Sequence, residues 1–303
     1  MTGVQTCALP ICWRHTCAVR PDTSVQCWGA NADGQLGNGT AGAAHSTPVT
    51  VSGLTGVVQL SAGINDTCAV TTTGGVWCWG MNYPDTVGSK SSTPKQITGI
   101  PAASKVSTSG EHACAVTTAG GLWCWGANDS GQLGTGPSTL TATGDPAKAP
   151  APVKANLDLA LSNVIDVAAF SAFGNPNIGT SGSTCALTLG TSEQLLCWGD
   201  NSVGQLGIGD GTVASASYPT GIPITVALSG LSAGGDSICA TATASSSIYC
   251  WGGNAAGQLG PNASGAAVLA PVSVSVPTDF SVTSVAIGPF GHACASTTGG
   301  DVF

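Results

Sequence analysis

The sequence predicts an all-β chain folded as a β-propeller of four-stranded antiparallel blades. Two observations support this class. A Cys-Trp-Gly motif recurs with its Trp at positions 28, 79, 125, 198 and 251, which is mostly near the 50-residue period of some propeller repeats. Short β-rich runs bounded by Gly and Pro lie between the motifs, and no stretch keeps the 3.6-residue hydrophobic period of an amphipathic helix. We therefore expect almost no helix.

Five segments carry the motif in an extended form. They begin at Cys27, Cys78, Cys124, Cys197 and Cys250 and read CWGANADGQLGNG, CWGMNYPDTVG, CWGANDSGQLGTG, CWGDNSVGQLGIG and CWGGNAAGQLG. Four of them contain the complete GQLG. Repeats of this kind distribute identical residues among equivalent units, so a scaffold role is expected for the motif.

Each unit is interpreted as four strands in a fixed order. A Pro-containing strand comes first, as in TPVTV at Thr47, because Pro lacks an N–H and suits a strand start or a sheet edge. A run such as VVQLSAG at Val57 follows, and then a strand such as TCAVTT at Thr67. The CWG strand comes last, joined to the third by a Gly-containing hairpin turn such as TTTGGV at Thr71.

The step from Trp125 to Trp198 is longer than the others and predicts two insertions, near 135–152 and 171–183. Long loops on a propeller lie at its faces, where partners bind. Tolerated insertion without a function is the simpler interpretation.

The two ends of the chain fall inside repeats. Residues 1–11, MTGVQTCALPI, match the translation of a sequencing adapter, and we interpret them as an artefact, with Cys12 as a corrupted Gly. Residues 12–303 are then expected to be an internal piece of a longer propeller.

The recurring residues of the motif have structural explanations. The Gly residues suit turns with positive φ or close backbone approach, and the Asn can bond its own backbone in an Asx turn. Trp and Leu supply apolar filling between blades. The structural motif residues are Trp28, Gly29, Asn31, Gly34, Gly37, Trp79, Trp125, Gly126, Trp198, Gly199, Trp251 and Gly252.

The pattern CWGxNxxGQLGxG resembles the repeat of the regulator of chromosome condensation family, of a bacterial exported type, over residues 12–303. The resemblance implies a seven-bladed propeller closed by pairing strands from the two termini. Five complete hairpins are present, with the start of a sixth at His292–Cys294.

Each complete unit contains two Cys, one on the third strand and one before Trp-Gly. Because these strands form one hairpin, the two Cys are expected to face each other within disulfide range, and to stabilise by about 3 kcal/mol per bridge. The expected pairs are Cys17 with Cys27, Cys68 with Cys78, Cys114 with Cys124, Cys185 with Cys197, and Cys239 with Cys250. Zinc is the alternative, but one Cys per strand is too dispersed for its usual ligand spacing.

Disulfides favour an oxidising compartment, so we predict an extracellular or cell-surface location. Charged residues make up 7% of the chain, with seven Lys and Arg against fifteen Asp and Glu. Seven cations scattered over the chain do not readily form a phosphate-binding patch, and no apolar run reaches the ~20 residues of a membrane span. Nucleic acid and membrane insertion are therefore not expected.

No zinc-protease motif or phosphate loop is present, and we predict no catalytic, cofactor or metal residues. Calcium at the turns of Asp33 and Asp129 is not expected, because each turn offers one carboxylate. The leading hypothesis is a non-enzymatic exported scaffold that binds a protein or glycan through its face loops, with enzyme inhibition as a variant. The alternatives are a guanine-nucleotide exchange factor or chromatin-binding regulator, as the family name suggests, and a propeller lyase or glycosidase with clustered carboxylates at the central channel.

Overall fold

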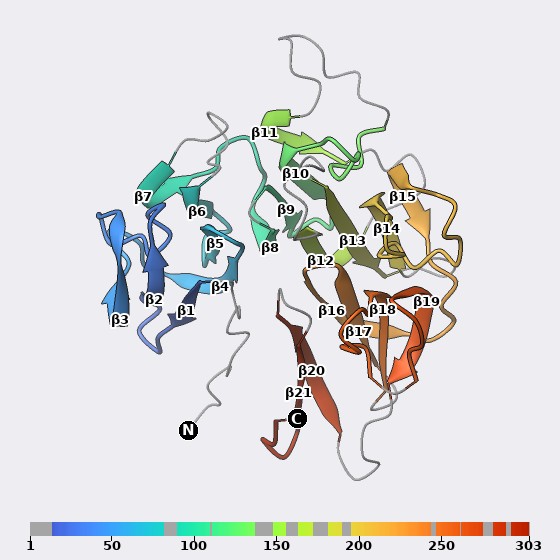
Figure 1. Ribbon diagram of the computed structural model, residues 1–303. Helices are drawn as coiled ribbons and strands as arrows, with labels where there is room; N and C mark the ends of the chain where they lie inside the picture. Colours follow the sequence, from blue (N-terminus) through green and yellow to red (C-terminus); the bar gives the residue numbers. More distant parts are fainter. Residues whose placement is uncertain are drawn as a thin grey trace. The chain divides into compact units, whose positions relative to one another are not determined.

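The structure is a computed structural model that describes residues 14–81, 90–109, 111–136, 148–155, 163–171, 181–189, 195–243, 247–260, 262–274, 281–288 and 292–302. In this part of the chain every regular element is a β-strand, which confirms the all-β prediction (Figure 1). The strands form six antiparallel sheets. The chain divides into two compact units, residues 1–127 with 148–154, and residues 128–147 with 155–303.

The first unit contains three sheets. The first sheet consists of β1 (His15–Val19), β2 (Val25–Asn31) and β3 (Gly42–Thr50). The second consists of β4 (Val57–Ala62), β5 (Asp66–Thr71), β6 (Val76–Met81) and β7 (Lys90–Gln96). The third consists of β8 (Ala103–Thr108), β9 (His112–Thr117), β10 (Leu122–Ala127) and β11 (Lys148–Lys154). Strand β8 lies against β4 and β5 of the preceding sheet.

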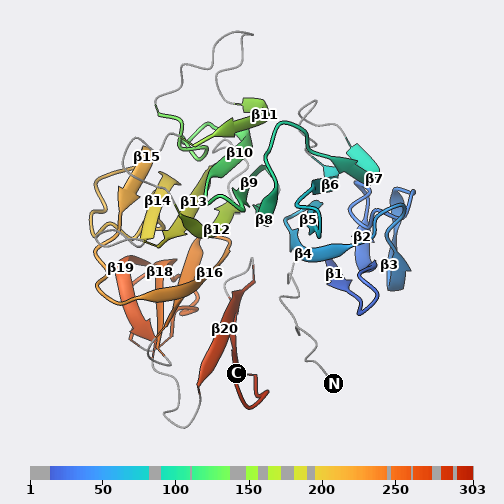
Figure 2. The same ribbon diagram turned by 180° about the vertical axis from the view of Figure 1, so that it is seen from behind.

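The second unit repeats this plan. The fourth sheet along the chain consists of β12 (Val164–Ser171), β13 (Gly182–Thr188), β14 (Leu195–Asp200) and β15 (Ser215–Gly221). The fifth consists of β16 (Leu228–Gly234), β17 (Ser237–Ala242), β18 (Ile248–Gly253) and β19 (Ala267–Val274), and the sixth of β20 (Val282–Ile287) and β21 (Ala293–Thr297). Strand β16 lies against β12 on one side and β20 on the other (Figure 2).

The predicted strand order within a sheet is wrong in one respect. The Pro-containing strand does not open a sheet but closes it, because it pairs with the CWG strand that precedes it in the sequence. In the first sheet, for example, Val49 of β3 lies opposite Cys27 of β2. Sheet membership depends on this non-local pairing, which turn signals on both sides of the strand do not reveal.

The position of each Pro explains why it is tolerated there. It lies in a bulge of the last strand, directly before the residue opposite the motif Cys, so its missing N–H falls where the ladder is already interrupted. The five prolines are Pro48, Pro94, Pro152, Pro219 and Pro271. Each last strand also lies at the edge of its sheet.

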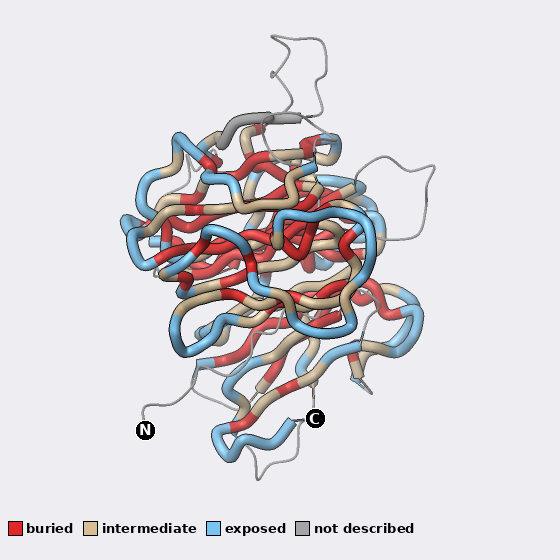
Figure 3. The backbone as a smooth tube through the Cα atoms, turned by 90° about the vertical axis from the view of Figure 1, so that its left-hand side faces the viewer, coloured by how far each residue is buried: buried red, intermediate tan, exposed pale blue. Residues whose placement is uncertain are grey.

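The core follows the middle strands of the sheets. Figure 3 shows the buried segments in red. Every residue of β5 is buried, and the same is true of β9, β13 and β17. Their sequences mix small apolar residues with buried polar ones such as Thr67, Asp66 and His112, so they do not alternate between buried and exposed positions. The core is therefore made at the boundaries between sheets.

Candidate functional site

The five predicted Cys pairs come together at these boundaries. In each pair the two residues lie directly opposite each other in a hairpin, with Cα atoms 4.1 Å apart and sulfur atoms 1.93–2.17 Å apart. The pairs are Cys17–Cys27, Cys68–Cys78, Cys114–Cys124, Cys185–Cys197 and Cys239–Cys250. All ten residues are buried. This placement is compatible with a disulfide in every complete repeat.

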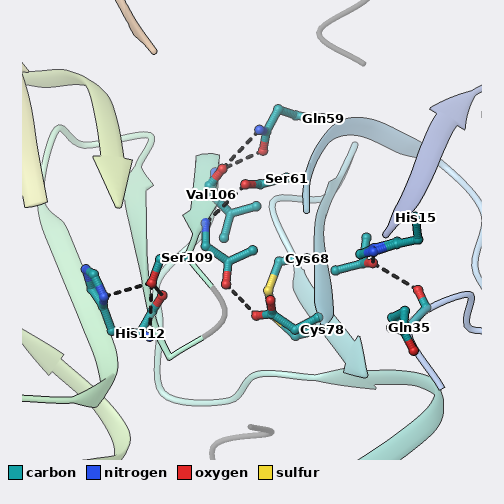
Figure 4. The surroundings of a disulfide bond; sticks show 12 residues. His15, Gln35, Gln59, Ser61, Cys68, Cys78, Val106, Ser109 and His112 are labelled. Atoms are coloured by element: carbon teal, nitrogen blue, oxygen red, sulfur yellow. Dashed lines mark hydrogen bonds between the residues drawn. A yellow bond between two sulfur atoms is a disulfide. The ribbon is translucent and has the colours of Figure 1, made fainter. Parts of the chain in front are cut away.

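Figure 4 shows the surroundings of the Cys68–Cys78 pair. Gln59 reaches from the second sheet to the backbone of Val106 in the third, donating from Nε2 to its carbonyl at 3.0 Å and accepting its N–H at 2.9 Å. The Thr108 N–H donates to Ser61 Oγ at 3.0 Å. The cysteine pair therefore lies beside a set of polar contacts that fasten one sheet to the next.

These polar contacts were not anticipated from the sequence. Equivalent bonds occur in the second unit, where the Leu231 N–H donates to Asp166 and the Ile287 N–H donates to Ser232. Different side chains (Gln, Asp, Ser) make these bonds, so no single residue type recurs at this position of the repeats. The detectable signal is a polar residue within the first strand of an otherwise apolar repeat.

The GQLG segment forms the second inter-sheet contact. The carbonyl of Gln35 accepts hydrogen bonds from Trp79 Nε1 at 2.9 Å and from Thr67 Oγ1 at 3.0 Å, both in the following sheet. The same Trp-to-Gln bond recurs in the second unit, from Trp198 to Gln132 at 2.9 Å and from Trp251 to Gln205 at 3.1 Å. The motif thus joins the loop of one sheet to the Trp of the next.

The motif Asn holds this loop in shape, although not through the expected Asx turn. Asn31 Oδ1 accepts the N–H of Leu36, five residues on, and Asn31 Nδ2 donates to the carbonyl of Thr40. Asn128, Asn201 and Asn254 make the same five-residue bond. An Asx turn spans two residues, so the prediction of a local backbone bond is correct and its length is wrong.

Two glycines of the motif occupy positions that other residues would not fit. Gly29 has φ +107°, and a Cβ there would collide with the carbonyl of Arg14. Gly37 has φ +65°, and a Cβ would lie 2.7 Å from Trp79 Nε1. The first Gly permits a close approach within its hairpin, and the second permits the Trp of the next sheet to pack on the loop.

Gly37→Ala is expected to destabilise the protein by about 2–4 kcal/mol, because the left-handed conformation and the collision with Trp79 both carry a cost. Gly53 is a matched control, since its φ of +69° is nearly the same but a Cβ there meets nothing within 4 Å. Gly53→Ala should cost about 1–2 kcal/mol. Urea denaturation of both variants measures the difference, and equal losses would contradict the packing role of Gly37.

Two ionisable groups, His15 and Asp66, are buried in inter-sheet contacts of the first unit. His15 Nε2 lies 2.8 Å from Thr67 Oγ1, and burial lowers the pKa of His15 to about 4. Asp66 Oδ2 accepts from Thr108 Oγ1 at 2.5 Å. Burial, with a smaller contribution from the charge of Glu111, raises the pKa of Asp66 to about 7, although hydrogen bonding from Thr108 and from the Asp66 backbone opposes this.

A second pair of interacting carboxylates lies in the second unit. Asp200 Oδ2 accepts hydrogen bonds from Gln205 Nε2 at 2.6 Å and Ser202 Oγ at 2.7 Å. Partial burial, followed by the charge of Asp200, raises the pKa of Asp236 to about 6. The enzyme hypothesis required clustered carboxylates. In the described residues, the charge of one carboxylate raises the pKa of another in two pairs, Glu111 acting on Asp66 and Asp200 acting on Asp236.

Other predicted features have different outcomes. In the described part of the chain, no group of three His, Cys, Asp or Glu side chains is placed to hold a metal ion. Asp33 forms an ion pair with Lys90 at 2.6 Å. Residues 1–13 and most of the insertions predicted near 135–152 and 171–183 lie outside the described residues. Across the described residues, no helix has the length and hydropathy of a membrane span.

The cations are not scattered, contrary to expectation. All seven Lys and Arg lie between Arg14 and Lys154, and all belong to the first unit. The second unit has no Lys or Arg and ten Asp and Glu. Asp129 and Asp210 are exposed there, in the loops that follow two CWG strands. The second unit therefore offers negative charge that no basic side chain of its own neutralises.

Repeated four-stranded antiparallel sheets joined through their first strands and motif loops define a β-propeller protein. Models of the regulator of chromosome condensation (RCC1) repeat match residues 24–70, 103–132, 119–169 and 245–295, together more than half of the chain. The chain belongs to the proteins built from RCC1 repeats. A search of curated protein sequences found no match.

Solved structures agree on the fold. Human WBSCR16 is 20% identical, with a TM-score of 0.76 over 94% of this chain and 70% of that protein. Yeast RCC1 (Prp20), crystallised with Kap60, is 23% identical, with a TM-score of 0.74 over 95% of this chain and 67% of that one. Prp20p from Saccharomyces cerevisiae, described with its binding properties to Gsp1p and histones, is 23% identical, with a TM-score of 0.74 over 95% of this chain and 69% of that one. At these identities the likeness concerns the fold alone.

Proposed function

We propose that this protein is an exported or cell-surface scaffold that binds another protein and performs no reaction of its own. The observation that carries the proposal is the use of the repeated residues. Trp, Gln, Asn, Gly and Cys of the motif are all engaged in holding sheets and loops together. A propeller of this kind leaves its loops for recognition, and function then depends on those loops rather than on the motif.

The charge distribution favours a basic protein as the partner of the second unit. A unit with ten Asp and Glu and no Lys or Arg, and with Asp129 and Asp210 exposed, attracts positive charge and repels phosphate backbones. Nucleic acid fits this unit poorly, because binding it requires cations that release phosphate counterions. A glycan remains the alternative ligand. Binding of an uncharged glycan would not depend on salt concentration, whereas binding of a basic protein would weaken as salt is added.

Binding of the full chain to poly-L-lysine and to duplex DNA, each at 50 and 300 mM NaCl, tests the partner chemistry. We expect salt-sensitive binding to poly-L-lysine and none to DNA. The Asp129→Asn/Asp210→Asn variant should weaken binding, whereas Asp22→Asn, an equally exposed carboxylate of the first unit, should not. Equal loss in both variants, or equal binding of DNA, would contradict a basic partner for the second unit.

The thiol count tests the exported location. If all five pairs are bridged, the denatured and unreduced protein should expose the three Cys outside the pairs, Cys7, Cys12 and Cys294, of the thirteen in the sequence. Bridges of this number persist in oxidising compartments and are rare in the cytosol and nucleus. Thirteen reactive thiols in protein purified without reductant from an oxidising host would contradict the proposal.

An RCC1-like regulator is the second candidate, favoured by the fold shared with yeast RCC1. Acceleration of GDP release from a small GTPase by the full chain would support it. The cysteine pairs argue against a nuclear or cytosolic regulator, so the thiol count also separates the two candidates.

A further inference from the structure

The start of strand β5 makes two inter-sheet contacts, one on each face of the strand. Thr67 bonds His15 of the first sheet, and its neighbour Asp66 bonds Thr108 of the third. Alternation along a strand sends adjacent side chains to opposite sides, so two consecutive residues connect three sheets. Both contacts contain one ionisable partner.

The Asp66 contact is unusual because half of the carboxyl group is unsatisfied. Asp66 is 7% exposed, and its Oδ1 is buried without a hydrogen-bond partner in the described structure. The Thr108 hydroxyl bonds the other oxygen. A neutral carboxyl group tolerates such a site, whereas an ionised one is left as a buried charge with a single side-chain hydrogen bond, from Thr108.

The groups around Asp66 increase this preference for the neutral form. Strand β6 places Gly80 opposite it, and β8 contributes the uncharged Thr108. The turn between β8 and β9 contributes the carboxylate of Glu111, whose charge acts against ionisation of Asp66. His112, next to Glu111, has its Nδ1 3.0 Å from Ser109 Oγ. No cation in the described residues offsets a charge on Asp66.

We propose that the boundary between the second and third sheets is a pH-sensitive contact, closed while Asp66 is protonated and loosened when Asp66 ionises. The contact concerns Thr108 and the two backbone bonds beside it, from Val106 to Gln59 and from Thr108 to Ser61. The first unit is thus held most tightly in mildly acidic surroundings, and its third sheet is released from the second near neutrality.

The direction follows from proton linkage. The pKa of Asp66 is raised from its usual 3.8 to about 7, so the folded state binds the proton more tightly than the unfolded state. The stabilisation is complete below pH ~4 and is lost as the pH rises through 7. His15 behaves in the opposite way. Its lowered pKa of about 4 keeps it neutral throughout the range in which folded Asp66 titrates, so the contact to the first sheet is unaffected there.

Hydrogen exchange of the full chain between pH 5.5 and 8.5 tests the proposal, with rates corrected for intrinsic exchange. We expect protection of the Val106 and Thr108 amides to fall at least about tenfold, since 1.4 kcal/mol corresponds to a factor of ten. The Val57 amide, bonded to the Thr23 carbonyl of the first sheet, is the internal control and should not change. No fall at Val106 and Thr108, or an equal fall at Val57, would overturn it.

Two variants make the test specific to Asp66. Asp66→Asn keeps an acceptor for Thr108 without a titrating proton, and its protection should not depend on pH. Glu111→Gln removes the neighbouring charge and leaves Asp66 in place, so the loss of protection should move to lower pH. An unchanged pH profile in Glu111→Gln would overturn the proposal even if Asp66→Asn does not fold.

Discussion

Trp79→Ala is expected to lower the free energy of unfolding by about 4 kcal/mol, within the range measured for buried aromatic residues. Trp79 is 1% exposed and packs with Cys17, Leu36 and Leu60 across the boundary between the first two sheets. The cost comes mainly from the cavity, because the Gln35 carbonyl that Trp79 bonds retains its second donor, Thr67. Denaturation by urea, followed by circular dichroism, measures the loss.

Trp28 provides the matched control for this prediction. It occupies the same place in the motif but is half-buried, so Trp28→Ala should cost clearly less, about 1–2 kcal/mol. The comparison separates the identity of the residue from its environment. If Trp28→Ala and Trp79→Ala destabilise equally, the role assigned to the inter-sheet boundary is wrong.

The second large effect is expected at the Cys68–Cys78 pair. Replacing both residues by alanine should lower the free energy of unfolding by about 3 kcal/mol, the stabilisation calculated for closing so short a loop, with some further loss of packing. The variant should also lose less stability than the wild type when reductant is added. Urea denaturation with and without reductant measures both quantities.

Cys294 is the control for the paired cysteines. It is half-buried and forms no bridge in the described structure. Cys294→Ala should therefore stay within about 0.5 kcal/mol of the wild type. Stability of the double alanine variant equal to that of Cys294→Ala would show that the Cys68–Cys78 pair is not bridged in solution.

The hairpins were the most predictable part of the fold. A Cys on each of two strands joined by a short Gly turn determines which residues oppose each other, and the observed register places Cys68 opposite Cys78. The assignment of the Pro-containing strand failed for a physical reason. That strand is separated from both neighbours by turns, so local sequence does not say with which it pairs. The partner is seen in the observed register, where Val49 lies opposite Cys27 of the preceding CWG strand.

The polar contacts between sheets were the least predictable part. Asp66 and His15 occupy equivalent places in different repeats, two residues before the first Cys of a pair. Burial at the boundary raises the pKa of Asp66 and lowers that of His15, and both shifts favour the neutral side chain. Such shifts depend on which neighbours the fold supplies, and one repeat in isolation does not contain them.

The bulged prolines have a consequence for how this chain avoids aggregation. Proteins commonly rely on mutual repulsion between charged surfaces to stay apart, and a chain with 7% charged residues has little of it. An interrupted outer strand is a poor template for a second molecule, because an incoming strand finds neither a flat ladder nor a continuous row of donors. The irregular backbone at the sheet edges thus opposes strand pairing between molecules, as charge repulsion does in other proteins. Unlike charge repulsion, this effect is not screened by salt.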